Sequence, residues 1–210
     1  MPDPHTDPHG HSTRTSKFRY LRYFGDYWNS PVNSHVLELV QLQPHERALD
    51  IGAGMGPAAI PAAGILTQGQ VVAIDPSAFM RRVLGIRRLW RRGRRRIRIL
   101  NGTAESIPVA DGSIDAAWAV NSMHHWASIA DAVKEILRVL RPGGRMLLLD
   151  EDFDHPEHKS HKPGQTNPHT MPSEEDLIDL LNSSGFSNVA AKQSTVAGNP
   201  VRRLQGEKPG

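Results

Sequence analysis

Short apolar runs separated by glycine-rich or polar turns dominate the middle of the chain. They are too short for helices and are bounded by turn residues, which is typical of buried strands. Between them, apolar residues recur every three or four positions, the spacing of a helix with one buried face. Residues 131–140 show this spacing most clearly. The pattern predicts strands at residues 47–51, 71–75, 97–100, 116–120 and 146–150.

The pattern is different towards both ends of the chain. Residues 1–16 hold almost nothing apolar, so we expect a disordered tail there. Residues 17–42 hold half of the aromatic side chains at helical spacing, and we expect a helical lid. That lid either packs on the core or covers a ligand, and the sequence leaves both possibilities open. The main domain is expected over residues 43–206, with a second tail at 207–210.

The C-terminal part of the main domain continues the alternation. Residues 173–184 have the spacing of a helix, and Gly185 marks its end. Two further apolar segments, 189–196 and 201–205, are plausible final strands.

The first apolar run leads into an unusual turn. It ends in an acid, Asp50, and three glycines follow at alternate positions, Gly52, Gly54 and Gly56. Glycine has no Cβ, so the backbone can adopt positive φ and approach a ligand closely. The next apolar run ends in Asp75, where an acid can accept hydrogen bonds from two ribose hydroxyls. The arrangement predicts a site for a cofactor with a nucleoside, although any single glycine-rich turn can be a plain strand-to-helix connection.

The acid that precedes the glycines distinguishes between cofactors. Dinucleotide sites hold a pyrophosphate on the glycine turn, and the carboxylate of Asp50 would repel a pyrophosphate. The same carboxylate suits a ligand that carries an ammonium group and no phosphate. Residues 50–56 thus resemble motif I of the class I methyltransferases that use S-adenosylmethionine.

Further motifs follow in the order and at the spacing of the small ubiquinone/menaquinone C-methyltransferase type, and the resemblance covers roughly residues 44–150. It implies an α/β fold, a Rossmann-like three-layer αβα sandwich with a seven-stranded, mostly parallel sheet and an antiparallel last strand. It also implies S-adenosylmethionine as cofactor and S-adenosylhomocysteine as product. The motifs that carry the resemblance are residues 50–56, Asp75, 104–108, 111–115, the pair His124 and His125, and 140–144.

The resemblance also implies which residues contact the cofactor. They are Asp50, Gly52, Ala53, Gly54, Gly56, Asp75, Pro76, Thr103, Ala104, Asn121 and, from the lid, Tyr27. Thr103 stands where many class I enzymes carry an acid that meets the adenine amino group. A hydroxyl at this place can still accept a hydrogen bond, although more weakly.

The end of the fourth strand carries the candidate catalytic residues, His124 and His125. Methyl transfer from a sulfonium mainly needs alignment and exclusion of water, and a general base helps when the acceptor is a hydroxyl, a phenol or an acidic carbon. Either histidine is a candidate base; the alternative is that one of them packs structurally and the other only shapes the pocket. Residues 121–124 lack the Asn/Asp-Pro-Pro-aromatic signature of amino methyltransferases, which argues against nucleic-acid amino groups as acceptors.

We therefore predict methyl transfer to a C- or O-nucleophile of a small molecule. The alternative from another class is a non-catalytic subunit that binds S-adenosylmethionine or S-adenosylhomocysteine. Nothing in the sequence identifies the acceptor.

Acids and histidines crowd residues 150–161, just after the fifth strand. Histidine and carboxylate are ligands for zinc and related metals, but no predicted helix holds them, and we assign no metal. The other interpretations are a polar active-site loop, with Asp152 or His155 as the base, and an ordinary surface loop.

The absence of cysteine excludes several kinds of chemistry. Without a thiol the chain has no disulfide, no cysteine nucleophile for cytosine C5 methylation and no cysteine-ligated iron–sulfur cluster. No apolar run reaches membrane-spanning length, and the N-terminus lacks a signal-peptide core. We expect a soluble cytoplasmic protein, a monomer or a homodimer.

Positive charge is concentrated on one predicted helix, residues 79–92. Ten of the nineteen arginines lie between Arg81 and Arg98. Phe79, Val83, Ile86 and Trp90 share one face of this helix, and the arginines lie mostly on the other face. The arginines form either a solvated helix face or a surface for a polyanion or acidic lipid. We expect a small-molecule acceptor as partner, with neither nucleic acid nor membrane.

Overall fold

Seven strands and five α-helices make up the described part of the chain. The computed structural model describes residues 31–152, 155–158 and 172–210. The strands are β1 (Arg47–Ile51), β2 (Gln70–Ile74), β3 (Ile97–Leu100), β4 (Ile114–Val120), β5 (Leu140–Glu151), β6 (Ser187–Val196) and β7 (Asn199–Glu207). The helices are α2 (Pro31–Val40), α3 (Ala59–Ile65), α4 (Ala78–Arg88), α5 (Ile129–Val139) and α6 (Glu174–Ser184), with short 3-10 helices η1 (Arg94–Arg96) and η2 (Met123–His125).

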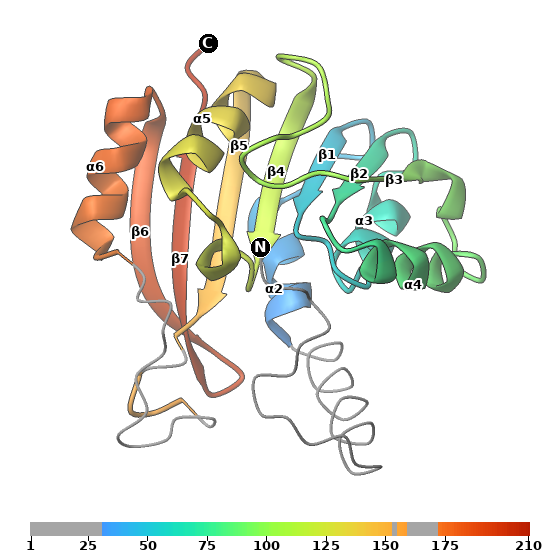
Figure 1. Cartoon of the computed structure of the whole chain (residues 1–210), viewed down its shortest axis with the longest axis horizontal. Coiled ribbons are helices and arrows are strands. Elements are labelled where there is room, and N and C mark those ends of the chain that lie inside the picture. Colours follow the sequence, from blue (N-terminus) through green and yellow to red (C-terminus); the bar gives the residue numbers. More distant parts are fainter. Residues whose placement is uncertain (1–30, 153–154, 159–171) are drawn as a thin grey trace. The chain divides into compact units, whose positions relative to one another are not determined.

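The strands form one sheet in the order β3-β2-β1-β4-β5-β7-β6 (Figure 1). β7 is antiparallel to both of its neighbours, and the other pairs are parallel. The predicted seven-stranded, mostly parallel sheet is therefore confirmed. The chain builds outward from β1 to β3 and then returns to β4 on the other side of β1. The carboxyl ends of β1 and β4 consequently lie side by side, the position where open α/β sheets bind ligands.

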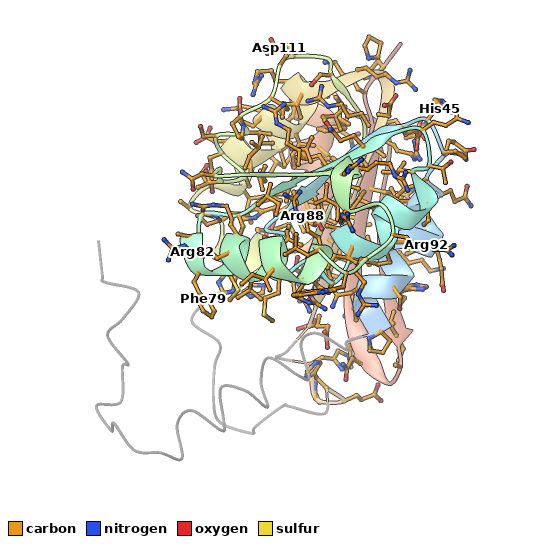
Figure 2. The ribbon with its side chains drawn as sticks, turned by 90° about the vertical axis from the view of Figure 1, so that its right-hand side faces the viewer. His45, Phe79, Arg82, Arg88, Arg92 and Asp111 are labelled. Carbon is orange, nitrogen blue, oxygen red and sulfur yellow. The ribbon has the colours of Figure 1, made fainter. Side chains whose placement is uncertain are left out.

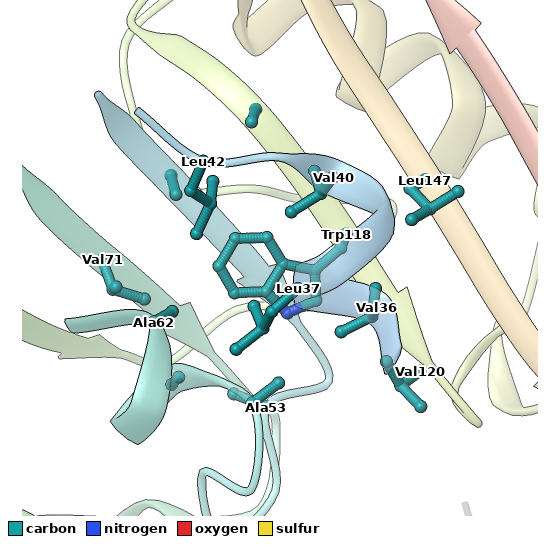
Figure 3. Close-up of a cluster of buried hydrophobic side chains, with 14 of the residues drawn as sticks. Val36, Leu37, Val40, Leu42, Ala53, Ala62, Val71, Trp118, Val120 and Leu147 are labelled. Atoms are coloured by element: carbon teal, nitrogen blue, oxygen red, sulfur yellow. The ribbon is translucent and has the colours of Figure 1, made fainter. Parts of the chain in front are cut away.

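Helices cover both faces of the sheet, so each face buries its own apolar core. One core includes residues of α2, α3 and α4, and the other includes residues of α5 and α6. Trp118 of β4 is the largest fully buried side chain. It lies beside Val36, Leu37 and Val40 of α2 (Figure 3). The predicted helix at 31–42 is thus part of the core, while Tyr27 and the rest of the predicted lid lie outside the described residues.

Helix ends follow their local chemistry. Ser173 and Asp176 form a capping box at the start of α6, and Gly185 ends that helix at φ +102°. α3 begins at Ala59, just beyond the glycine turn, because Gly56 has φ +79° and cannot form part of a right-handed helix.

The sequence analysis misplaced the apolar face of α4. Phe79, Ile86 and Trp90 are exposed, and the one buried residue of the helix is Leu84. Arginines take the inner side instead: Arg81 donates to the Asp75 carbonyl over 2.7 Å, and Arg88 donates to the Ile97 carbonyl. Long arginine stems can pack on apolar surface while their heads reach backbone oxygens. The periodicity therefore located the helix correctly but did not identify its buried side.

The last strand is longer than predicted. β7 continues to Glu207, which the sequence analysis assigned to a tail. Lys208 exchanges backbone hydrogen bonds with Gly143 and Gly144, and its Nζ donates to the carbonyls of Leu137 (2.9 Å) and Leu140 (2.7 Å). The chain is held in place at least to Lys208.

Candidate active site

The glycine turn follows β1 and is clamped to the end of β2. Gly52, Gly54 and Gly56 have φ of +67°, +52° and +79°, the left-handed region that favours glycine. The Ala53 N–H donates to the Ile74 carbonyl over 2.9 Å. The conformation expected from the glycine spacing is present.

Close packing adds a second reason for glycine at two of these positions. A Cβ on Gly52 would collide with the Ser122 hydroxyl, which lies just after β4. A Cβ on Gly56 would collide with the Leu84 side chain of α4. The turn therefore touches the segment that carries the two histidines, and this contact joins the parts of the site.

Asp75 braces the turn with both carboxylate oxygens. Oδ2 accepts from the Gly54 N–H and Oδ1 accepts from the Ser77 N–H, each over 2.8 Å. Burial raises the pKa of Asp75, and these two N–H groups oppose the rise. Each carboxylate oxygen has a second acceptor position, so the group can brace the turn and still accept hydrogen bonds from a ligand.

Asp50 is 3% exposed and lies beside Trp118 on the neighbouring strand. Among the described residues, neither its Oδ2 nor the Trp118 Nε1 has a hydrogen-bond partner of good geometry. Burial raises the pKa of Asp50 to about 8, and Asp75 adds to the rise. A carboxyl group in this position is neutral below that pH and gains from any positive charge placed near it.

His124 is held by a buried carboxylate. It lies in η2, at the carboxyl end of β4, and its Nδ1 is 2.7 Å from Asp150 Oδ1 at the end of β5. Asp150 is 2% exposed; burial raises its pKa, and the bond to His124 opposes the rise. When the carboxylate accepts from Nδ1–H, Nε2 keeps its lone pair. The geometry is that of a base oriented by an acid.

His125 is more open than His124. It is exposed, and its ring centroid lies 4.0 Å from that of His124 with an interplanar angle of 52°. Its backbone N–H donates to the Ser122 carbonyl over 3.0 Å. The paired carboxylate distinguishes His124 as the better candidate base.

Asn121 forms a hydrogen-bonded pair with Glu151. Its Nδ2 donates to Glu151 Oε1 and its Oδ1 accepts from the Glu151 N–H, both over 2.8 Å. Glu151 Oε2 in turn contacts Asn199 Nδ2 at 2.5 Å and lies 3.3 Å from His158 Nε2. Both ends of the Asn121 amide are thus engaged by Glu151, and the predicted contact of Asn121 with the cofactor stays a prediction.

The predicted adenine-side residues lie at the ends of β2 and β3. Pro76 and Thr103 are exposed, and Ala104 is buried. The Thr103 side chain forms a hydrogen bond with Glu105. Because its side chain is exposed, Thr103 is accessible to a ligand.

Two of the alternative bases are engaged elsewhere. Asp152 Oδ2 pairs with Arg202, 3.0 Å from Nη2, and His155 Nδ1 accepts from the Glu157 N–H over 3.2 Å. The described residues contain no group of three or more His, Cys, Asp or Glu side chains that could hold a metal ion. Residues 153–154 and 159–161 of the acid- and histidine-rich loop lie outside the described residues.

Sequence reasoning missed the pairing of His124 with Asp150. The sequence did contain a signal for this pairing. His124 lies just beyond one apolar run and Asp150 lies at the end of another, and neighbouring parallel strands bring their carboxyl ends together. What the sequence did not supply was the register, which pairs Val120 with Leu149.

The middle of the chain is similar to known proteins. Residues 49–148 match the profile of a family described as "Methyltransferase domain". The chain is 31% identical over 115 residues to the uncharacterised methyltransferase YcgJ of Bacillus subtilis, covering 55% of the chain and 44% of YcgJ. The crystal structure of YcgJ superposes with a TM-score of 0.67 at 18% identity, over 85% of the chain and 98% of YcgJ.

Two other proteins are informative. The chain is 28% identical over 186 residues to the O-methyltransferase rstn1 of Aspergillus nomiae, covering 76% of the chain and 78% of that protein. The [4+2]-cyclase SpnF superposes with a TM-score of 0.70 at 21% identity, over 84% of the chain and 80% of SpnF. The chain spans less than half the length of two curated relatives that it matches, 34% and 44%. The structural likenesses show the fold alone.

Proposed function

We propose that this chain, whose residues 49–148 match a family described as "Methyltransferase domain", is a class I S-adenosylmethionine-dependent methyltransferase that transfers a methyl group to a C- or O-nucleophile of a small molecule. One observation carries the proposal: His124, which pairs with Asp150 of β5, lies in the segment that also touches the glycine turn through Ser122. A histidine that a buried acid orients, placed beside the turn that would bind the cofactor, can deprotonate a methyl acceptor. The resemblance to an O-methyltransferase supports the same class of acceptor.

The residues present fit S-adenosylmethionine. The turn has no side chain at Gly52, Gly54 or Gly56, and its positive-φ backbone is held from both strands. Asp75 retains acceptor capacity for the ribose hydroxyls. Asp50 offers a buried carboxyl oxygen without a hydrogen-bond partner among the described residues, and this group would favour the ammonium of the methionine part.

When bound, S-adenosylmethionine supplies an electrophilic methyl group on a sulfonium and leaves as the neutral thioether S-adenosylhomocysteine. The chain supplies the proton acceptor. His124 Nε2 takes the proton from the acceptor O–H or acidic C–H while the new bond to the methyl carbon forms. Asp150 stabilises the imidazolium that results, because its carboxylate holds Nδ1–H. The base contributes typically 10²–10⁴-fold, and alignment contributes the larger part.

Two measurements on the full chain test the proposal. Calorimetry should show binding of S-adenosylmethionine. Incubation with methyl-labelled S-adenosylmethionine and the small-molecule fraction of a cell extract should then give a labelled product that excess S-adenosylhomocysteine suppresses. Binding without any labelled product would instead favour a non-catalytic subunit, and the absence of binding would contradict both interpretations.

A further inference from the structure

The most exposed large apolar side chains of the described residues belong to α3, α4 and the turn after α4. Trp90 is 78% exposed, Phe79 59%, Ile86 58%, Leu89 50% and Ile65 39%. Figure 2 shows Phe79 on the edge of α4 that is turned away from the sheet. We call these five side chains the α4 face. An exposed apolar cluster of this kind marks an interaction surface more often than an isolated apolar residue does.

Unpaired positive charge surrounds the α4 face. Residues 76–104 contain ten arginines and no acid. Within the described part of the chain, the following exposed arginines form neither an ion pair nor a side-chain hydrogen bond: Arg82, Arg91, Arg92 and Arg95. On other surfaces, by contrast, arginines are paired with carboxylates: Arg138, Arg141, Arg145 and Arg202. Within the described residues, these four arginines of the α4 region therefore differ from the carboxylate-paired arginines of the other surfaces.

A shallow pocket adjoins the face between α3 and α4. Its volume is about 340 Å³, and it is lined by Ile60, Pro61, Gly64, Arg87, Arg91 and Arg92. Its walls therefore combine apolar groups with three guanidinium groups, and no acid is among them. Burial and the neighbouring Arg91 lower the pKa of Arg87 to about 10, which reports crowding of positive charge. A phosphate group beside an acyl chain would match both kinds of wall.

We propose that the α4 face docks on a membrane surface that contains anionic phospholipid. The apolar side chains would enter the boundary between headgroups and acyl chains, and the surrounding arginines would meet the phosphates, as in interfacial amphipathic helices. Tryptophan is favoured at this boundary because its ring is apolar and its N–H is polar. No helix of the described residues has the length and apolarity needed to cross a bilayer, so the contact would be peripheral. The proposal does not depend on the methyltransferase reaction.

The aliphatic members of the face decide between lipid and nucleic acid. Arginines and a tryptophan alone would also suit a single-stranded nucleic acid, through phosphate contacts and stacking. Ile65, Ile86 and Leu89 offer neither charge nor an aromatic plane. They gain only from an apolar environment, which acyl chains supply.

Vesicle flotation of the full chain tests the docking. We expect the chain to float with vesicles of phosphatidylcholine plus phosphatidylglycerol and to remain behind with vesicles of phosphatidylcholine alone. Added salt should reduce the bound fraction, because the arginine contribution is electrostatic.

Three variants separate the parts of the face. Replacing both Arg91→Gln and Arg92→Gln should weaken partition to the anionic vesicles about 30-fold, and Trp90→Ala should weaken it roughly tenfold. The matched control removes two positive charges elsewhere, Lys134→Gln with Lys192→Gln, and should bind as the unaltered chain does. Arg87 is left unchanged because it donates to the Met55 carbonyl in the glycine turn. Equal unfolding midpoints will show that the variants are folded.

Several results would overturn the proposal. These are no flotation of the unaltered chain with anionic vesicles, and equal flotation of all variants. A dimer in sedimentation equilibrium that Trp90→Ala converts to monomer, without vesicle binding, would assign the face to a second copy of the chain. Tight binding of single-stranded RNA with no vesicle binding would assign it to nucleic acid.

Discussion

The two halves of the candidate site are built from different kinds of contact. In the cofactor half, the glycine turn and Asp75, side-chain oxygens accept hydrogen bonds from main-chain N–H groups. In the acceptor half, side chains pair with one another across 26 residues for His124 and Asp150 and across 30 residues for Asn121 and Glu151. Main-chain geometry follows from where glycine stands in the sequence. Side-chain pairs depend on which strands become neighbours and in what register.

The difference predicts separate functional effects. Changes in the cofactor half should act on the affinity for S-adenosylmethionine, whereas changes in the acceptor half should act on turnover. Each of the following experiments either sharpens this division or removes it.

The largest effect is expected at His124. Replacing His124→Ala should lower kcat about a thousandfold, since the general base and its oriented lone pair are lost.

Asp150→Asn should lower kcat about a hundredfold and should change the pH profile of turnover, because the imidazolium loses its carboxylate. Steady-state kinetics with labelled S-adenosylmethionine will measure both. The matched control is Asp152→Asn, whose carboxylate pairs with Arg202; a loss of turnover there as large as at Asp150 would contradict the assignment.

The second effect concerns the glycine turn. Gly52→Ala places a Cβ against the Ser122 hydroxyl at a φ of +67°. We expect about a hundredfold weaker binding of S-adenosylmethionine by calorimetry and a loss of roughly 1–3 kcal/mol in the free energy of unfolding. Gly64→Ala is the control, since it lies in α3 with nothing within 4 Å of the added carbon. That change should stabilise the chain by up to about 1 kcal/mol and leave affinity unchanged.

These two halves also differ in how far the sequence revealed them. The strands, the glycine turn and Asp75 were predictable because local composition specifies them. The partner of His124 was not, because a single sequence does not give the register between β4 and β5. The bond between Asn121 and Glu151 was not predictable for the same reason, since it is visible only once the strands are aligned.

The error at α4 has another origin. Helical periodicity shows that apolar residues share a face, but it does not show which face is buried. At the edge of the sheet, Arg81 and Arg88 could satisfy backbone oxygens of neighbouring segments. The helix therefore turned Arg81 and Arg88 inward and left Ile86 and Trp90 exposed. A long charged side chain is compatible with either side of a helix, and this is why the sequence alone was misleading.

A smaller effect is expected at Asp75. Asp75→Asn keeps one acceptor oxygen but loses the charge and one of the two acceptors that brace the turn. Affinity for S-adenosylmethionine should fall about tenfold, with kcat at saturating cofactor nearly unchanged. Calorimetry and saturation kinetics separate the two quantities. A fall in kcat without a change in affinity would place Asp75 in the acceptor half and remove the proposed division.

The last effect concerns stability rather than ligand binding or turnover: it is a pH dependence of the free energy of unfolding that comes from Asp50. Its folded-state pKa of about 8 lies above the ordinary value of 3.8, so the folded chain holds a proton that the unfolded chain releases. This contribution to stability is complete below the unfolded pKa and is lost as the pH rises through the folded pKa. The slope should approach 1.4 kcal/mol per pH unit between about pH 5 and 7. Urea unfolding across that range should show a shallower slope for Asp50→Asn, because an amide cannot ionise.

Bound S-adenosylmethionine should also flatten the slope of the unaltered chain, since its ammonium would favour the ionised carboxylate. A slope that the ligand leaves unchanged would show that Asp50 does not belong to the cofactor half.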